Sequence, residues 1–228
     1  MSAIKVNCEN IEISNNNKIC IIAGPCQLET EQHALDMAGK IKEITSKFGL
    51  GFIYKTSFDK ANRTSLKGKR GAGLDASLPV FDKIKKELNV PILTDIHNAE
   101  QCEIVSKHVD VLQIPAFLCR QTDLISHAAR NAKILNIKKG QFLSPNEMLL
   151  VVDKVKTVNP NIKLMITERG TTFGYNNLVV DMRSLEILKK SKDRIKSPCK
   201  YFKPGGCGGC DFQHISPEIQ KNFEGIFR

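Results

Sequence analysis

The sequence predicts an α/β fold of the TIM (β/α)8-barrel type that is incomplete, with about six β/α units and then an atypical tail. Six segments are nearly continuous in apolar and β-branched residues, as buried parallel strands are. They span residues 18–24, 51–57, 91–96, 111–117, 134–140 and 162–168. Amphipathic segments that predict helices alternate with them at 30–48, 74–88, 99–107, 122–133, 145–157 and 178–190. This alternation indicates right-handed parallel crossovers.

Polar residues at the strand ends favour a barrel over a doubly wound sheet. Nearly every predicted strand ends in polar or charged side chains, among them Gln27, Lys55, Asp95, Lys138 and Arg169. A doubly wound sheet gathers ligand groups mainly at its switch point, whereas a barrel brings all strand ends to one mouth. No glycine-rich dinucleotide motif or phosphate loop follows a strand, so the sequence gives no support for a nucleotide cofactor.

Composition and charge narrow the function classes. The net charge is +10, but residues 189–203 carry seven lysines and arginines against one aspartate and so supply +6 of it. The remaining positive charge lies near strand ends with few aromatic residues between, which favours small phosphorylated ligands over nucleic acid. No apolar tract is long enough to span a membrane, and the first residues lack a signal-peptide pattern. We therefore expect a cytoplasmic protein without nucleic-acid or membrane partners, with its eight cysteines reduced.

The chain divides at about residue 190. Residues 1–190 are predicted to form a partial barrel domain, and residues 191–228 a basic tail that contains glycines and cysteines. The apolar periodicity stops at this point, which suggests a truncation or a frame disruption. Cys207, Cys210 and His214 form half of a zinc motif without a matching second half, so a zinc site in the tail is disfavoured.

The loop at residues 58–70, "FDKANRTSLKGKR", predicts an anion site. It holds five cations and follows a strand that already contains Lys55. Lys138 and Arg169 end two later strands, and clustered like charges are costly unless an anion neutralises them. A solvated basic loop is the alternative for the loop taken alone. Asp95 and His97 end the third strand, where they could transfer protons or only form structural hydrogen bonds.

Six motifs resemble one enzyme family in their order and spacing. "AGPCQLE", "KTSFDKANRTS", "TDIH", "QIPAFLCRQTDL", "NIKKGQFLSP" and "TERGTTFGYNNLVVDMRSL" are similar to 3-deoxy-D-manno-octulosonate 8-phosphate synthases, from about residue 19 to 190. The resemblance implies a transferase of lipopolysaccharide biosynthesis. Such an enzyme condenses phosphoenolpyruvate with D-arabinose 5-phosphate.

The resemblance also implies site residues. Lys60, Lys138 and Arg169 match the phosphoenolpyruvate site, with Gln113 and Ala116 close to the same ligand. The sugar phosphate is implied to bind at Asn62, Arg63 and Thr64, with Lys55 in the same basic cluster. We expect Lys60, Asn62, Lys138 and Arg169 to act in catalysis. Arg120 matches an arginine that reaches the sugar phosphate of a neighbouring subunit, which implies a homo-oligomer, typically a tetramer; a surface arginine is the alternative.

Two alternatives to this function stay open. The related 3-deoxy-7-phosphoheptulonate synthases, which use erythrose 4-phosphate, carry "KPRTS" where this chain has "KANRTS"; a proline offers no side-chain amide, so Asn62 favours the longer sugar. The other alternative is a non-catalytic remnant that at most binds phosphorylated ligands.

Cys26 is the one candidate metal ligand that the resemblance implies. A cysteine in "AGPC" marks the metal-dependent members of the family, with zinc or iron favoured and manganese possible, although a buried cysteine is most often an apolar filler. The family's histidine, glutamate and aspartate ligands lie in motifs that this sequence lacks. No organic cofactor is expected.

Overall fold

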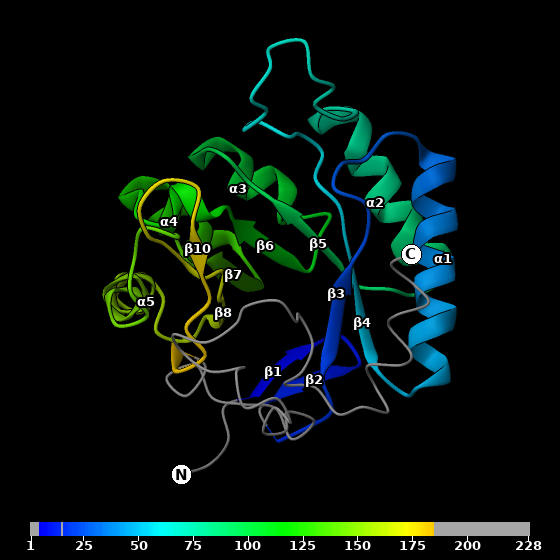
Figure 1. Cartoon of the computed structure of the whole chain (residues 1–228). Coiled ribbons are helices and arrows are strands. Elements are labelled where there is room, and N and C mark those ends of the chain that lie inside the picture. Colours follow the sequence, from blue (N-terminus) through cyan, green and yellow to red (C-terminus); the bar gives the residue numbers. More distant parts are fainter. Residues whose placement is uncertain (1–4, 15, 185–228) are drawn as a thin grey trace.

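A six-stranded parallel sheet forms the centre of the molecule. The computed structural model describes residues 5–14 and 16–184. The strands are β3 (Cys20–Ala23), β4 (Gly51–Lys55), β5 (Ile92–Asp95), β6 (Val111–Ile114), β7 (Ile134–Lys138) and β8 (Lys163–Thr167). Each strand pairs with the next one along the chain, and Figure 1 shows the sheet curling with its helices outside. This sequential order confirms the incomplete barrel, since a doubly wound sheet reverses its order at the switch point.

Five helices cover the sheet. They are α1 (Glu31–Lys47), α2 (Leu74–Leu88), α3 (Ala99–Val105), α4 (Thr122–Asn131) and α5 (Glu147–Val158). The predicted cap at Thr30 is confirmed, because its side chain accepts a hydrogen bond from the His33 amide at 3.2 Å. Ahead of α5, the Ser144 amide donates to Glu147 Oε2 at 2.7 Å and Ser144 Oγ accepts from the Glu147 amide, which forms a capping box.

An N-terminal hairpin closes one end of the half-barrel. Its strands are β1 (Lys5–Cys8) and β2 (Ile11–Ser14), which pair antiparallel. The buried residues of β1 pack inside the sheet against one side chain from each of four central strands. This inner cluster contains Val6, Cys8, Ile53, Leu93, Val111 and Ile134. The hairpin was not expected from the sequence. It fills the part of the sheet interior away from the carboxyl ends of the strands, so those ends remain available for polar groups.

Two predicted elements are corrected near strand ends. The predicted strand 111–117 ends at Ile114, and a short 3-10 helix at Ala116–Leu118 follows it. The predicted helix 178–190 is wrong at its start, because β9 (Thr171–Thr172) and β10 (Leu178–Val179) form an antiparallel hairpin. Gly174 and Asn176 adopt positive φ angles of 65° and 57°, which reverse the chain between the two strands.

The tail lies outside the described residues. The described chain ends at Ser184, so the rest of that predicted helix, the tail 191–228 and the expected disruption near residue 190 are not part of it. Five complete β/α units and a sixth strand are present in the described part. No helix there is long and apolar enough to cross a membrane.

Candidate active site

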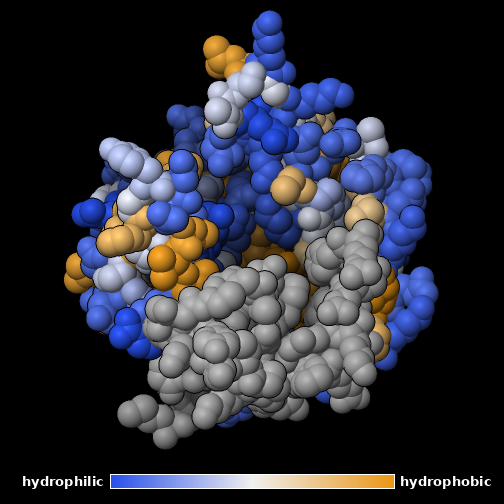
Figure 2. All heavy atoms as spheres, viewed as in Figure 1, coloured by the Kyte–Doolittle hydropathy of each residue, from blue (hydrophilic) through white to orange (hydrophobic). Residues whose placement is uncertain are grey.

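A cavity of about 440 Å³ opens at the carboxyl ends of the strands. This volume lies within the roughly 300–1,000 Å³ typical of small-molecule sites. On the face shown in Figure 2, hydrophilic residues line the upper part of a hollow near the centre, and hydrophobic residues lie at its lower edge. The cavity is lined by Asp59, Lys60, Ala61, Asn62, Asp95, His97, Pro115, Ala116, Phe117, Leu118, Lys138 and Arg169. All four residues that we expect to act in catalysis are therefore in its wall.

Asp95 is the electrostatic centre of the cavity floor. One of its oxygens, Oδ2, accepts from Ser57 Oγ and lies 3.0 Å from Lys55 Nζ. The other, Oδ1, accepts from Gln113 Nε2 at 2.7 Å and lies 3.4 Å from Lys138 Nζ. Burial raises the pKa of Asp95, but attraction to Lys55 and Lys138 and the two hydrogen bonds outweigh burial and lower it. Asp95 is therefore ionised at neutral pH.

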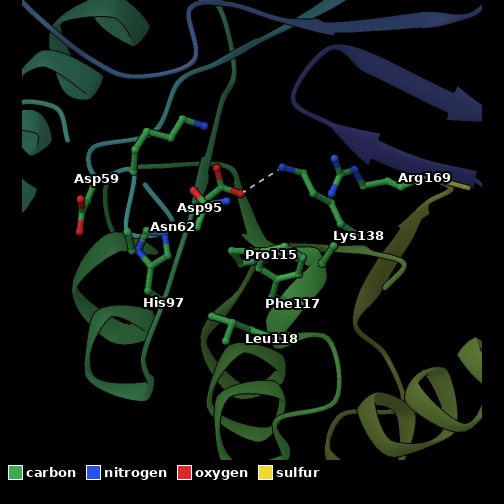
Figure 3. A pocket seen from close by; sticks show the side chains of 12 residues that line it. Asp59, Asn62, Asp95, His97, Pro115, Phe117, Leu118, Lys138 and Arg169 are labelled. Atoms are coloured by element: carbon green, nitrogen blue, oxygen red, sulfur yellow. Dashed lines mark hydrogen bonds and ion pairs between the residues drawn. The ribbon is translucent and has the colours of Figure 1, made fainter. Parts of the chain in front are cut away.

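Two cations of the cavity have no such partner. Among residues 5–14 and 16–184, no acceptor contacts the Lys60 ammonium or the Arg169 guanidinium. Burial, followed by repulsion from Lys55, lowers the pKa of Lys60. Burial also lowers the pKa of Lys138, and Asp95 opposes that effect. In Figure 3, Lys138 and Arg169 reach towards Asp95 from one side. This wall carries more positive charge than its single floor carboxylate neutralises, so it favours an anionic ligand.

A second hollow adjoins the first through two shared residues. It measures about 630 Å³ and is lined by Cys26, Lys60, Asn62, Arg63, Thr64, Ser65, Gly68 and Lys69. Arg63 lies here rather than in the first cavity, and its guanidinium donates to Gln27 Oε1 at 2.6 Å and to the Lys69 carbonyl at 3.0 Å. Lys60 and Asn62 belong to both hollows. The geometry therefore provides two neighbouring polar hollows for two ligands.

The basic loop is held at its base and projects beyond the strand ends. Arg70 forms a two-pronged ion pair with Asp59, and the Lys60 amide donates to the Arg70 carbonyl at 2.6 Å. Figure 1 shows this segment as the cyan loop between β4 and α2. Arg70 and Asp59 neutralise each other, and the backbone hydrogen bond to Arg70 fixes the position of Lys60. The loop is therefore not only a solvated basic segment.

His97 faces the cavity as an uncharged group. Burial is the main cause that lowers its pKa, so the ring is neutral at pH 7. It packs edge to face on Phe58 with the ring centres 5.6 Å apart, and its buried Nδ1 has no hydrogen-bond partner in the described structure. In Figure 3 it lies with Asn62 on the side of Asp95 opposite Lys138 and Arg169. His97 therefore adds a polar group, not a further cation.

Three of the expected substrate-binding residues lie outside both hollows. Lys55 and Gln113 sit beneath the cavity, where both are bonded to Asp95. Arg120 is exposed after β6, and its carbonyl accepts from Lys154 Nζ at 3.4 Å. Ala116, in contrast, lines the first cavity together with Phe117. The apolar wall of Phe117 and Leu118 was not expected from the sequence, because apolar residues just after a strand carry no distinct signal.

The described residues do not fit the expected metal site. Cys26 is exposed and lines the second hollow. Yet no group of three histidine, cysteine, aspartate or glutamate side chains that could hold a metal ion occurs within residues 5–14 and 16–184. One thiolate does not complete the three or four ligands that zinc requires.

The comparisons with known proteins decide the family. The sequence model of the DAHP synthetase I family matches residues 3–196. The chain belongs to this family. Relatives named 2-dehydro-3-deoxyphosphooctonate aldolase confirm the resemblance to octulosonate phosphate synthases. The relative from Mesorhizobium japonicum is 54% identical over 203 residues, which cover 88% of this chain and 73% of the relative.

Two further relatives carry the same name. The one from Chelativorans sp. is 61% identical over 175 residues, which cover 77% of this chain and 63% of the relative. The one from Brucella anthropi is 52% identical over 211 residues, which cover 91% of this chain and 75% of the relative. The chain thus spans between 63% and 75% of the lengths of these family members.

Proposed function

We propose that the strand-end hollows bind phosphoenolpyruvate and D-arabinose 5-phosphate and condense them to 3-deoxy-D-manno-octulosonate 8-phosphate and phosphate. The observation that carries this proposal is one cavity lined by Lys60, Lys138 and Arg169, in which Lys60 and Arg169 have no anionic partner within residues 5–14 and 16–184. Phosphoenolpyruvate carries a carboxylate and a phosphate, and guanidinium and ammonium groups bind both. The name of the relatives favours the octulosonate over the heptulosonate product.

The reaction forms one carbon–carbon bond and one carbon–oxygen bond, the latter from water, and it breaks the carbon–oxygen bond that joins C2 to phosphate. The C3 of phosphoenolpyruvate attacks the aldehyde carbon of the sugar, and the aldehyde oxygen takes up a proton. Water adds to C2, and phosphate leaves with its bridging oxygen. Lys60, Lys138 and Arg169 would stabilise the negative charge that redistributes over carboxylate and phosphate. Their positions in a preformed wall reduce the reorganisation that the reaction requires.

The second hollow is proposed to hold the sugar phosphate. Arg63 and Thr64 provide donors for phosphate and hydroxyl oxygens, and Asn62 borders both hollows at the point where the two substrates must meet. Placing the reacting carbons next to each other supplies much of the rate enhancement in a two-substrate reaction. Asn62 offers a side-chain amide to a sugar hydroxyl, and a proline at this place would offer none. The presence of Asn62 therefore favours the longer sugar over erythrose 4-phosphate.

Two expectations of the sequence stay proposals. A homotetramer is proposed because Arg120 is exposed and available to a neighbouring subunit. A divalent metal at Cys26 would need ligands that the described residues do not provide, so no step of the reaction is routed through it. The cytoplasmic location stays a prediction of the sequence.

The decisive experiment offers the purified chain phosphoenolpyruvate with either arabinose 5-phosphate or erythrose 4-phosphate and measures phosphate release. We expect faster release with arabinose 5-phosphate. Faster release with erythrose 4-phosphate would reverse the choice between the two sugars. Binding of phosphoenolpyruvate by calorimetry without turnover of either sugar would instead support the non-catalytic remnant.

A further inference from the structure

A chain of buried polar side chains runs beneath the cavity across four neighbouring strands, from Thr167 on β8 to Asp95 on β5. Thr167 Oγ1, on β8, lies 3.0 Å from Nδ2 and 3.1 Å from Oδ1 of Asn136 on β7. Asn136 Nδ2 donates to Gln113 Oε1 on β6 at 2.7 Å, and Gln113 Nε2 donates to Asp95 Oδ1 at 2.7 Å. Asn136 and Gln113 are each only 3% exposed. Neither Asn136 nor Thr167 lines the cavity.

The chain has a direction, because an amide has one donor end and one acceptor end. The Asn136 amide nitrogen donates a hydrogen bond to the side-chain oxygen of Gln113, so the Gln113 amide nitrogen must face Asp95. A flipped Gln113 would place its own oxygen against the carboxylate and its nitrogen against the Asn136 nitrogen. Both contacts would be repulsive in a buried site, where unpaired polar groups are costly. Asn136 thus selects the orientation of Gln113.

The orientation of the Asp95 carboxylate determines which of the nearby cations form an ion pair with it and which do not. The groups that face Asp95 are Lys55 at the end of β4, Ser57 just after β4, Gln113 on β6 and Lys138 on β7. Lys60 and His97 are also close enough to act on its charge. The first four occupy both carboxylate oxygens. An Asp95 released from Gln113 could rotate and pair with Lys60. The cavity would then lose one of its two unpaired cations.

We propose that Asn136 and Thr167 are positioning residues: they orient Gln113, which holds Asp95 on Lys55 and Lys138 and so keeps Lys60 free for phosphoenolpyruvate. The choice of ligand rests on the proposed function. The positioning itself rests only on the four hydrogen-bonded side chains, so the two can be tested separately.

The variants are matched in shape. Thr167→Val removes the hydroxyl and keeps the branched side chain, Thr167→Ser restores the hydroxyl, and Asn136→Leu removes the amide. Thr157→Val is the control, because its hydroxyl bonds to the Asp153 carbonyl at 2.8 Å on the outer helix α5, far from the cavity lining. Circular dichroism shows which variants fold. If Asn136→Leu does not fold, Thr167→Val still tests the proposal.

The first readout is the phosphoenolpyruvate dissociation constant by calorimetry. We expect Thr167→Val and Asn136→Leu to weaken phosphoenolpyruvate binding about fivefold or more, because each variant removes at least one hydrogen bond from the chain that orients Gln113. Thr167→Ser should stay within about twofold of the parent chain, and the Thr157→Val control should not change. An equal loss in Thr167→Ser and Thr167→Val would overturn the positioning role, because the hydroxyl would then not matter.

The second readout needs no ligand. A limiting amine-reactive reagent labels the free chain, and mass spectrometry gives the rate at Lys60 relative to the exposed Lys67 on the same loop. In Thr167→Val the released Asp95 should pair with Lys60 and slow its labelling, while Lys138 should react faster. Unchanged ratios would overturn the proposal. A shift in the ratios with no phosphoenolpyruvate binding by the parent chain would refute the proposed function and leave the positioning role intact.

Discussion

Replacing Lys60 by methionine should separate ligand binding from stability. An ammonium at about 4 Å from a phosphate contributes about 4 kcal/mol at an effective dielectric constant near 20. Lys60 is partly solvated, and Lys138 and Arg169 remain in the wall, so we expect a net loss of about 2–3 kcal/mol, which is about 30- to 150-fold in affinity. The free chain should not be destabilised. Burial and repulsion from Lys55 already disfavour the Lys60 charge, so its removal should maintain or raise the melting temperature.

Calorimetry with phosphoenolpyruvate and thermal melting of the free chain measure the two effects. The matched control is Lys67→Met, which removes the same charge from the same loop at an exposed position outside both hollows. Because both variants lower the net charge by one, long-range attraction changes equally in the two. The reasoning is refuted if Lys60→Met weakens binding no more than Lys67→Met, or if its melting temperature falls while that of Lys67→Met does not.

Four further outcomes follow from the structure. Phosphoenolpyruvate affinity should fall as pH rises through the lowered pKa of Lys60, hence at a lower pH than for an ordinary lysine; a calorimetric pH series checks this. Phe81→Ala should cost about 3–5 kcal/mol in urea unfolding, and Leu66→Ala within about 0.5 kcal/mol, because Phe81 is fully buried and Leu66 fully exposed. Asp110→Asn should cost about 1–3 kcal/mol by the same assay, since the buried Asp110 carboxylate accepts from Lys85 and the Ile92 amide. Chelator treatment should leave the phosphoenolpyruvate dissociation constant unchanged, because the cationic cavity contains no candidate metal ligand cluster within the described residues.

Most of the barrel could be predicted from the sequence because its strands are mainly apolar and the four central ones, β4 to β7, are largely buried on both faces. An apolar run six or seven residues long is visible without knowledge of its neighbours, and each of the six predicted runs contains one strand of the sheet. Helix α2 begins and ends at the predicted residues, Leu74 and Leu88. The C-terminal end of α2 is determined by a residue next to it in the sequence, because Asn89 adopts a left-handed φ of 48° that stops the helix.

The N-terminal hairpin and the β9–β10 hairpin could not be predicted in the same way. Their strands are two to four residues long, which is too short for a periodicity to stand out. What holds β1 in place is its packing on Ile53 and Val111, residues far away in the sequence. The β9–β10 pair depends on the left-handed turn at Gly174 and Asn176, whereas the apolar residues "LVV" at 178–180 by themselves predict the start of a helix. Non-local packing and turn geometry therefore set the limit of the fold prediction.

The sequence predicts that the candidate site residues lie at strand ends, but it does not predict which of the cations are neutralised by a carboxylate. Lys55 and Lys60 lie five residues apart in one basic segment, and composition gives no reason to treat them differently. The fold places Lys55 against the Asp95 carboxylate at 3.0 Å, whereas Lys60 lines the cavity without an acceptor in the described structure. Which lysine is neutralised depends on where the end of β5 lies relative to the end of β4, and strand pairing determines that position.

The pairing also explains why a single carboxylate can organise so many cations. Parallel neighbours in register bring the ends of β4, β5, β6 and β7 together, so residues as far apart in the sequence as Lys55 and Lys138 reach one point. Asp95 projects from the second of these strands, and its two oxygens divide between Lys55 on one side and Gln113 and Lys138 on the other. A carboxylate one strand further along would reach Lys138 but leave Lys55 unpaired. A third unneutralised cation would then lie directly beneath the cavity, and its repulsion from Lys60 and Lys138 would oppose folding before any ligand arrived. The position of Asp95 in the strand order therefore sets the balance between a stable free chain and a wall that still attracts an anion.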